Sequence, residues 1–353
     1  MYGLVPTTWA GSGVLCNNGG SLVGLQPFVT VIIPVYNVAE QLSECLRAIG
    51  KSSYSAYEVI VVDDASSDGS LDVARTSGII AYGLPRKSGP AAARNLGARY
   101  ARGDILFFID SDVLIQRDTI ERLMRNFTEG ETIAAVFGSY DDDPPQKNFF
   151  SQYKNLLHHF IHQSSCKEAG TFWAGCGAIR KSLFTRLGGF NEKAYQKPCI
   201  EDIELGYRIK AAGYRIILDK DLQVKHLKRW SFKSLILTDI FARAIPWTKL
   251  IRDRHVMVDD LNLQMSQKAS AALACLVALI LPVLPFHPIL ILLALACLAI
   301  VLGINHGLFR LFLNRNGWKF AACAFGMHLL YYLYSTAAFA LYSAFYWNSR
   351  DCR

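Results

Sequence analysis

The chain has 353 residues, of which 37 are Lys or Arg and 29 are Asp or Glu, so its formal net charge at pH 7 is +8. This length exceeds one average domain, and we expect a catalytic-sized domain with a second part attached. The positive charge alone would suit nucleic acid or an anionic membrane, but long uncharged tracts near the C-terminus favour the membrane and argue against nucleic acid. The nine cysteines show no spacing typical of a zinc site or a disulfide framework.

The first 26 residues contain Gly-Ser-Gly and Asn-Asn-Gly-Gly and lack the basic start and apolar core of a signal peptide. We therefore expect residues 1–26 to be a flexible leader, and we assign it no function. From residue 29 onward, short apolar runs alternate with stretches of helical spacing, which is typical of an α/β domain with a parallel sheet. The expected strands begin at Val29, at Glu58, near Ile79 and at Ile105, and the expected helices cover 39–49, 70–76 and 90–101.

Two carboxylates separated by Ser111 follow the fourth expected strand, whose apolar run Ile105–Ile109 suits burial on both faces of a sheet. Ligands of open α/β sheets bind just beyond the carboxyl ends of such strands. In extended backbone, Asp110 and Asp112 leave the same face and can converge on one cation. Because Mg²⁺ and Mn²⁺ are commonly held by one or two carboxylates together with substrate phosphates, we interpret the pair as a metal and diphosphate site. Two solvated aspartates in a loop are the alternative.

Polar side chains also follow the first two expected strands. Tyr36 and Asn37 end the first strand, and Asp63 and Asp64 end the second. One such cluster is usually a helix cap, whereas clusters at the ends of successive parallel strands would share one crevice. We therefore expect a ligand site at this edge of the sheet.

Four motifs occur in order along this part of the chain: Pro-Val-Tyr-Asn, Val-Val-Asp-Asp-Ala-Ser-Ser-Asp-Gly, Gly-Pro-Ala-Ala-Ala-Arg-Asn-Leu-Gly and Asp-Ser-Asp. Together they resemble family 2 glycosyltransferases of the GT-A fold over roughly residues 27–230. The resemblance implies a Rossmann-like, mostly parallel sheet that binds a nucleotide-sugar donor, and family frequency favours a UDP-sugar. Asp63 is then structural. The residues that the resemblance and the metal interpretation assign to the donor are Pro34, Tyr36, Asn37, Asp64, Arg94, Asp110 and Ser111.

Arg94 and a later run of small residues are further candidates. Arg94 would contact the nucleotide or its phosphates, with a solvated charge on an amphipathic helix as the alternative. In the run Gly175-Cys176-Gly177, glycines would let the backbone approach a substrate closely. The resemblance implies that this region lines the donor sugar and the acceptor.

Acidic residues cluster at the start of a helix expected near residue 201. Glu201 and Glu204 share one helical face and could pair, while Asp202 points elsewhere. The resemblance implies that Asp202 is the catalytic base and that Glu201 lies in the acceptor or donor-sugar region. A base there would deprotonate a hydroxyl that attacks the anomeric carbon opposite the leaving diphosphate, and the sugar would be transferred with inversion.

His226-Leu227-Lys228-Arg229-Trp230 occupies the place of the Gln-X-X-Arg-Trp motif of processive polysaccharide synthases, with His in place of Gln. Histidine is a competent ligand for Mn²⁺ or a diphosphate donor, so we take His226 as a further metal ligand beside Asp110 and Asp112. Arg229 and Trp230 are donor-binding candidates by the same resemblance. A lone surface histidine is the alternative, and the replacement of Gln weakens the case for a processive polymerase.

The last third of the chain is apolar. Residues 231–266 combine apolar residues at helical intervals with many basic ones, as expected of an amphipathic helix at a membrane interface. Residues 269–309 and 320–349 contain no Asp, Glu, Lys or Arg. Because a spanning helix needs about 20 apolar residues, we expect about three transmembrane helices in 267–349. The flanking basic residues place the GT-A domain on the cytoplasmic side of what we expect to be a bacterial inner membrane.

The sequence thus predicts a membrane-anchored, inverting, Mn²⁺- or Mg²⁺-dependent glycosyltransferase that acts on a hydroxyl of a lipid-linked or glycan acceptor. The alternatives are a polyprenyl-phosphate glycosyltransferase, a processive polysaccharide synthase and a catalytically silent membrane scaffold. The sugar, the exact acceptor and the oligomeric state are left open by these patterns.

Overall fold

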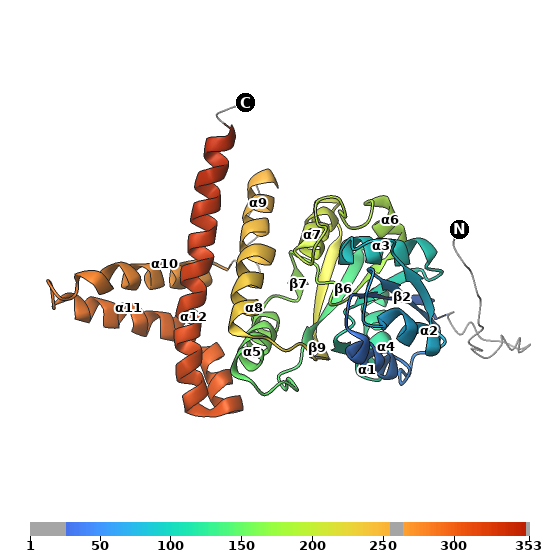
Figure 1. The fold of residues 1–353 in the computed structure, drawn as a ribbon, viewed down its shortest axis with the longest axis horizontal. Helices are drawn as coiled ribbons and strands as arrows, with labels where there is room; N and C mark the ends of the chain where they lie inside the picture. The colour runs from blue at the N-terminus through green and yellow to red at the C-terminus, as the bar shows by residue number, and fades with distance from the viewer. Residues whose placement is uncertain (1–25, 255–263, 351–353) are drawn as a thin grey trace, which may run out of the picture. The chain divides into compact units, whose positions relative to one another are not determined.

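The computed structural model describes residues 26–254 and 264–350. Contacts divide the described residues into two compact units, one within 26–140 and 167–227 and the other within 141–166, 228–254 and 264–350. Figure 1 shows the elements of both units along the chain. Residues 141–166 therefore fall in the second unit, although the sequence analysis placed them inside one domain over 27–230.

The first unit is built on a nine-stranded sheet with the strand order β3-β2-β1-β4-β8-β6-β9-β5, and β7 pairs with β9. Strands β1 to β4 are parallel to one another, while β8 runs antiparallel between β4 and β6. The α/β class and the mostly parallel sheet are confirmed. The strand bounds are β1 Val29–Val35, β2 Tyr57–Asp63, β3 Ile80–Gly83, β4 Ile105–Ile109, β5 Val113–Leu114, β6 Ile133–Tyr140, β7 Glu168–Ala169, β8 Cys176–Arg180 and β9 Arg215–His226.

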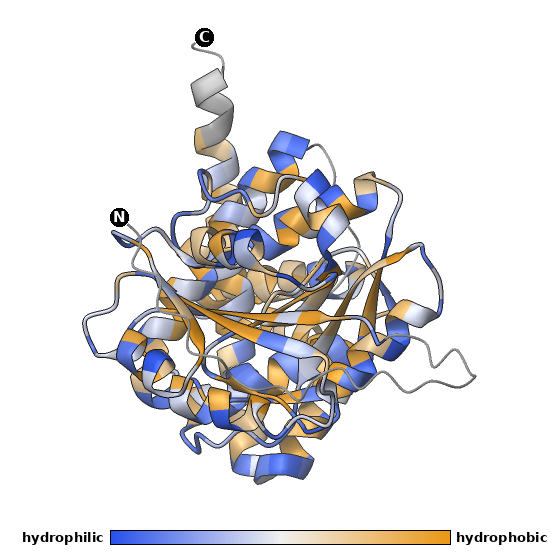
Figure 2. Cartoon of the chain, turned by 90° about the vertical axis from the view of Figure 1, so that its right-hand side faces the viewer, coloured by the Kyte–Doolittle hydropathy of each residue, from blue (hydrophilic) through white to orange (hydrophobic). Residues whose placement is uncertain are grey.

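The sheet is buried on both faces, which explains the continuous apolar runs of its central strands. In β4, Phe107 and Ile109 belong to one core cluster, whereas Leu106 and Phe108 belong to another on the opposite face. Figure 2 shows the strands as apolar ribbons between helices of mixed hydropathy. The helices of this unit are α1 Ala39–Ile49, α2 Ser70–Thr76, α3 Pro90–Tyr100, α4 Thr119–Thr128, α6 Lys181–Arg186 and α7 Glu201–Ala211.

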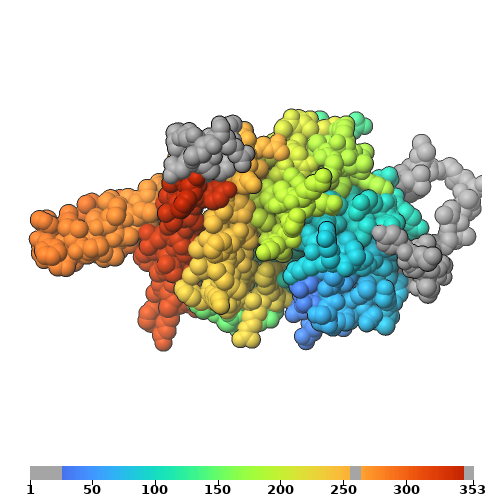
Figure 3. Space-filling view, turned by 45° about the horizontal axis from the view of Figure 1, so that its top comes forward, coloured from blue at the N-terminus to red at the C-terminus, as the bar shows by residue number. Residues whose placement is uncertain are grey.

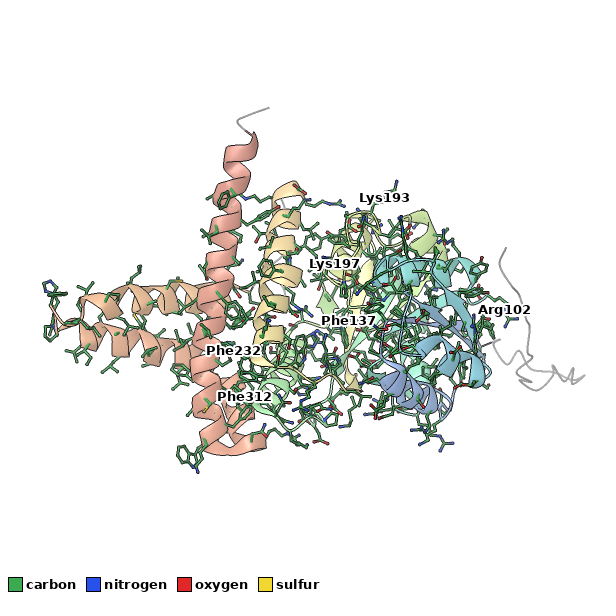
Figure 4. All side chains as sticks on the ribbon, viewed as in Figure 1. Arg102, Phe137, Lys193, Lys197, Phe232 and Phe312 are labelled. Atoms are coloured by element: carbon green, nitrogen blue, oxygen red, sulfur yellow. The ribbon has the colours of Figure 1, made fainter. Side chains whose placement is uncertain are left out.

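The second unit is helical. Its core combines aromatic and aliphatic side chains of α5, α8 and α12, and the rings of Tyr153 and Phe312 lie 5.7 Å apart between centroids. Phe312 is labelled on α12 in Figure 4, as is Phe232 at the start of α8. The helices are α5 Phe149–Ser164, α8 Phe232–Leu237, the π-helix η1 Thr238–Ala244, α9 Ile245–Arg254, α10 Met265–Ile280, the 3₁₀-helix η3 Leu281–Val283, α11 Leu290–Ile304 and α12 His306–Arg350.

Helices α10 and α11 form an antiparallel hairpin, drawn in orange in Figures 1 and 3. Its exposed side chains are largely apolar. Phe286 and Ile289 at its tip are 79% and 72% exposed. Within the described residues, one helix is long and apolar enough to cross a membrane, Met265–Val283 with 19 residues. Helix α11 and residues 306–345 pass the same test only together, across a 74° bend. The expected apolar helices are present, and the three full spans remain a prediction.

Helix α7 packs against residues 171–172 at a glycine. A Cβ on Gly206 would lie 2.4 Å from the Phe172 amide nitrogen and 2.8 Å from the Thr171 carbonyl carbon. Backbone atoms cannot yield as a flexible side chain could, so we expect Gly206→Ala to destabilise the protein by about 1–3 kcal/mol through overpacking. Thermal unfolding of the purified protein measures this as a lowered Tm.

Gly50→Ala is the matched control for this substitution. Gly50 has right-handed backbone angles, and its Cβ would be 3.5 Å from the nearest atom, which is ordinary contact. The control should leave Tm unchanged or slightly raised. Equal Tm values for both variants would contradict the close approach of α7.

Candidate active site

The Asp-Ser-Asp motif forms a tight turn at the end of β4. The Asp110 amide donates to the Gly175 carbonyl at 3.1 Å, and the Val113 amide donates back to the Asp110 carbonyl at 3.1 Å. The expectation of extended backbone through the motif is therefore wrong, because the chain must turn here for β5 to pair with β9. The Asp110 and Asp112 side chains remain 34% and 22% exposed, so both reach the surface.

The pairing of β5 with β9 brings His226 to this turn. Val113 lies opposite His226 in the antiparallel register, and the Leu227 amide donates to the Asp112 carbonyl at 2.8 Å. The His226 Nε2 atom is 3.5 Å from the Asp112 carboxylate. The imidazole stacks on the Tyr140 ring at 4.2 Å between centroids, and its exposed fraction is 7%. The structure thus places His226 beside Asp112. The alternative interpretation of His226 as a solvated surface residue is wrong.

A divalent cation fits the donor atoms of this corner. Carboxylate oxygens suit Mg²⁺ and Mn²⁺, and an imidazole nitrogen suits transition metals. Within 26–254 and 264–350, no three His, Cys, Asp or Glu side chains form a complete metal-holding group. Asp112, His226 and the adjacent Asp110 have the oxygen and nitrogen donors that such a cation accepts, and their role as metal ligands stays a prediction.

Arg94 is neither solvated nor directed to an open surface. Its Nη2 atom donates to Asp110 Oδ1 at 2.7 Å, and its Nη1 atom donates to Glu201 Oε1 at 2.8 Å. The side chain is 4% exposed, so the predicted alternative of a solvated charge is wrong. Burial alone would lower the pKa of Arg94, but Asp110 and Glu201 outweigh it and raise the pKa.

Asp202 lies in the first turn of α7, where the helix dipole favours negative charge. It is half-buried, and its Oδ2 atom accepts a hydrogen bond from the Ala174 amide at 3.0 Å. Its neighbour Glu201 accepts from the Cys199 amide at 3.0 Å. Glu204 forms an ion pair with Arg208 at 2.7 Å, a partner on the same helix that the sequence prediction did not name.

The predicted nucleotide-binding side chains differ in how far they are already engaged. The buried Asp64 carboxylate accepts from the Ser88 and Gly89 amides at 2.6 and 2.8 Å and so fixes the loop before α3. Asn37, with φ of 52°, accepts from the Ser67 amide at 2.8 Å. These bonds join the loops that follow three parallel strands.

Tyr36 presents an exposed aromatic ring at the carboxyl edge of the parallel strands, and the residue is 39% exposed. The Lys87 Nζ atom lies 3.4 Å from the centroid of the Tyr36 ring, a cation–π contact. Pro34 lies within β1, opposite Val62. Asp63 accepts from the Ser66 amide at 3.0 Å, which agrees with a structural role.

The Gly175-Cys176-Gly177 run is constrained by packing inside the protein. The Gly175 carbonyl accepts the hydrogen bond from the Asp110 amide. A Cβ on Gly177 would lie 2.2 Å from the Trp173 carbonyl oxygen. Cys176 is fully buried in the core beneath the motif. Close approach of residues 172–173 is thus one reason for these glycines, and their contact with a substrate stays a prediction.

Arg229 and Trp230 belong to the second unit. Trp230 is 5% exposed. Its amide donates a hydrogen bond to the Ser151 hydroxyl, and its carbonyl accepts one from the Asn148 side chain. The Lys228 Nζ atom is 4.3 Å from the indole centroid. Trp230 thus belongs to the core of that unit, and Arg229 is exposed.

Sequence reasoning missed the basic loops beside Asp64. Arg86 and Lys87 are exposed in the loop before Gly89, and Lys193 and Lys197 are exposed in the loop before α7 (Figure 4). The two loops meet, because a Cβ on Gly89 would lie 2.6 Å from the Gln196 backbone. Positive charge at such a rim attracts phosphate. The run Arg-Lys-Ser-Gly-Pro at residues 86–90, which leads into α3, could have indicated this basic loop from the sequence.

Comparisons with known proteins bear on this geometry. Residues 30–188 match the family model described as "Glycosyl transferase family 2". Glycosyltransferase AglE of Haloferax volcanii is 42% identical over 103 residues, covering 27% of this chain and 34% of that protein. An undecaprenyl-phosphate 4-deoxy-4-formamido-L-arabinose transferase of Edwardsiella ictaluri is 28% identical over 176 residues, covering 47% of this chain and 53% of that protein. The chain therefore spans about half the length of these curated relatives, or less.

A solved structure with a similar fold is that of a mannosyltransferase from Pyrobaculum calidifontis in complex with GDP-Man and Mn²⁺. The TM-score is 0.55 at 22% sequence identity, and the match covers 89% of this chain and 86% of that one. At this identity the similarity concerns the fold alone. It confirms the predicted GT-A architecture.

The burial of Cys176 can be tested chemically. Burial raises the pKa of the Cys176 and Cys45 thiols well above the usual range, so both should stay protonated and inaccessible at pH 8. We expect iodoacetamide to modify the exposed Cys166 in the folded protein and to leave Cys45 and Cys176 unmodified, as read by peptide mass spectrometry. Modification of Cys176 as fast as Cys166 would contradict this placement.

Proposed function

We propose that the chain transfers a sugar from a nucleotide-sugar donor to a hydroxyl of a lipid-linked or glycan acceptor at the cytoplasmic face of a membrane. The match of residues 30–188 to "Glycosyl transferase family 2" and the GT-A fold support this proposal. One observation carries the proposal. The Asp-Ser-Asp turn is joined through Arg94 to the acidic start of α7, so carboxylates suited to a cation and to proton transfer lie around one corner of the sheet.

The donor would occupy the edge formed by Tyr36, Asp64 and the Asp-Ser-Asp turn. The exposed Tyr36 ring can stack on a base, and the basic rim at Lys87 and Lys197 can attract the diphosphate. The Asp110, Asp112 and His226 side chains would hold Mn²⁺ or Mg²⁺, and the complex of the mannosyltransferase with Mn²⁺ supports a divalent cation. When bound, the cation would neutralise charge on the leaving diphosphate. A UDP-sugar is the proposed donor.

Asp202 would serve as the general base. Its carboxylate is held by the Ala174 amide and remains half-buried at the start of α7. From there it would take the proton of the acceptor hydroxyl, which attacks the anomeric carbon opposite the leaving group and inverts its configuration. The Ala174 and Ile203 amides donate to its two oxygens, at 3.0 and 2.8 Å, and hold the carboxylate in one orientation.

The second unit would anchor the enzyme. Residues Met265–Val283 form a helix of about 28 Å at 1.5 Å per residue, close to the roughly 30 Å of a bilayer core. Lys268, Arg310 and Lys319 flank the apolar helices and would stay on the cytoplasmic side. We propose an integral membrane protein of a bacterial inner membrane, with the GT-A domain in the cytoplasm.

A polyprenyl-phosphate acceptor is the second candidate. The similarity to the Edwardsiella ictaluri undecaprenyl-phosphate 4-deoxy-4-formamido-L-arabinose transferase favours it. A phosphate acceptor is already ionised and needs little base catalysis, so the two candidates differ in what they require of Asp202.

Removal of Asp112 should abolish cation-dependent turnover. In native membranes supplied with radiolabelled nucleotide sugars and Mn²⁺, we expect label in the organic-extractable fraction with the native protein and a loss of about 10²-fold or more in Asp112→Ala, as for loss of a major electrostatic stabiliser. Asp142→Ala is the control, since Asp142 lies in the other unit and pairs with Arg315. Unchanged turnover in Asp112→Ala would contradict the metal assignment.

Substitution of Asp202 distinguishes the two acceptor classes. Loss of a general base typically costs about 10²–10⁴-fold in rate, so Asp202→Asn should lose that much kcat if the acceptor is a hydroxyl. The variant should retain most activity if the acceptor is a phosphate. The measurement is initial rate with donor saturating, and Asp221→Asn, at an exposed position of β9, is the matched control.

A further inference from the structure

Hydrogen bonds connect the two chemical centres of the first unit in a closed loop. On one side, Arg94 bonds Asp110 at 2.7 Å and Glu201 at 2.8 Å. On the other side, Asp202 accepts from the Ala174 amide at 3.0 Å, and the adjacent Gly175 carbonyl accepts from the Asp110 amide at 3.1 Å. The loop therefore runs from the Asp-Ser-Asp turn to the start of α7 and back.

Arg94 is the central charge of this loop. Arg94 and Glu201 are each 4% exposed, so their mutual attraction must compensate for the water that both charges lose on burial. Asp202 also contributes to the charge around the guanidinium. The planar guanidinium can bond two carboxylates at a fixed separation, which an ammonium group cannot do. The Phe190 ring lies 5.6 Å from the guanidinium carbon and limits its movement.

We propose that Arg94 is a positioning residue that fixes the spacing between Asp110, on the donor side, and the Glu201–Asp202 segment, on the acceptor side. This proposal rests on the proposed function and replaces a direct contact between Arg94 and the nucleotide. Both η nitrogens are engaged by protein carboxylates, and the remaining Nε atom is buried without a hydrogen-bond partner. Through this bridge, Arg94 holds the donor-side and acceptor-side carboxylates at a fixed distance from each other.

The test compares Arg94→Lys and Glu201→Gln with the native protein. Arg94→Lys keeps the charge but loses the planar group that holds both carboxylates at one separation, and Glu201→Gln keeps the shape but weakens the hydrogen bond to Arg94. Because misplacement of reacting groups by about 1 Å can cost 10²-fold, we expect kcat to fall about 10–10²-fold in each variant, with the donor KM changed less than about threefold. The double variant should be little worse than either single one, because both break the same bridge.

Hydrogen exchange gives a readout that does not depend on activity. In Arg94→Lys, amides of residues 110–114 and 199–205 should both exchange faster than in the native protein, since both ends of the bridge are released. The matched control is Arg208→Lys, which breaks another arginine–glutamate pair on the same helix. Arg208 also donates to the Leu187 and Gly189 carbonyls, so exchange should rise near 187–190 and not at 110–114.

Two results would overturn the proposal. A donor KM raised tenfold in Arg94→Lys with unchanged kcat, and native kinetics in Glu201→Gln, would identify Arg94 as a nucleotide contact. Faster exchange confined to α3 would show that the bridge does not fix the two segments. Glu201→Gln supplies the exchange test on its own if Arg94→Lys fails to fold. Failure of the proposed function itself would appear differently, as absence of sugar transfer by the native protein.

Discussion

Burial of β4 on both faces of the sheet is the constraint on which the site depends. Five apolar side chains alternate between two core clusters, so a shift by one residue would exchange the two sets and draw a flanking aspartate, Asp104 or Asp110, into the buried strand. The first polar residue after the run, Asp110, is thereby fixed at the carboxyl edge of the sheet. The parallel strands β1 and β2 end at the same edge, which brings Tyr36 and Asp64 to it.

The same alternation explains how much could be predicted. Apolar runs of strand length followed by carboxylates are local features, so the four parallel strands and the ligand edge could be read from the chain directly. The turn at Asp110–Asp112 could not, because it depends on β5 pairing with the far end of β9, more than a hundred residues away. That register also brings His226 to Asp112, which only the family resemblance suggested.

Arg94 shows a second limit of local reasoning. An arginine on a helix with small neighbours resembles a solvated charge, and nothing within α3 indicates two buried acceptors. Those acceptors, Asp110 and Glu201, come from a strand end and from the start of another helix. Gly175 and Gly177 show a different limit, because residues 172–173, only a few positions away, occupy the space that a Cβ would need at both. The contact of these glycines with a substrate stays a prediction beside this packing requirement.

In the second unit, a buried ion pair specifies how apolar helices assemble. Asp239 lies in the π-helix η1, where it bonds Lys154 of α5 at 2.5 Å and accepts from the Tyr334 hydroxyl of α12 at 2.8 Å. Burial lowers the pKa of Lys154, and Asp239 opposes that shift. Such a pair adds little net stability compared with apolar packing, but leaving either charge unpaired is costly. The aliphatic contacts between these helices would tolerate several alignments, but the bonds of Asp239 are satisfied only where α5, η1 and α12 meet. This requirement accounts for residues 141–166 folding with the C-terminal helices.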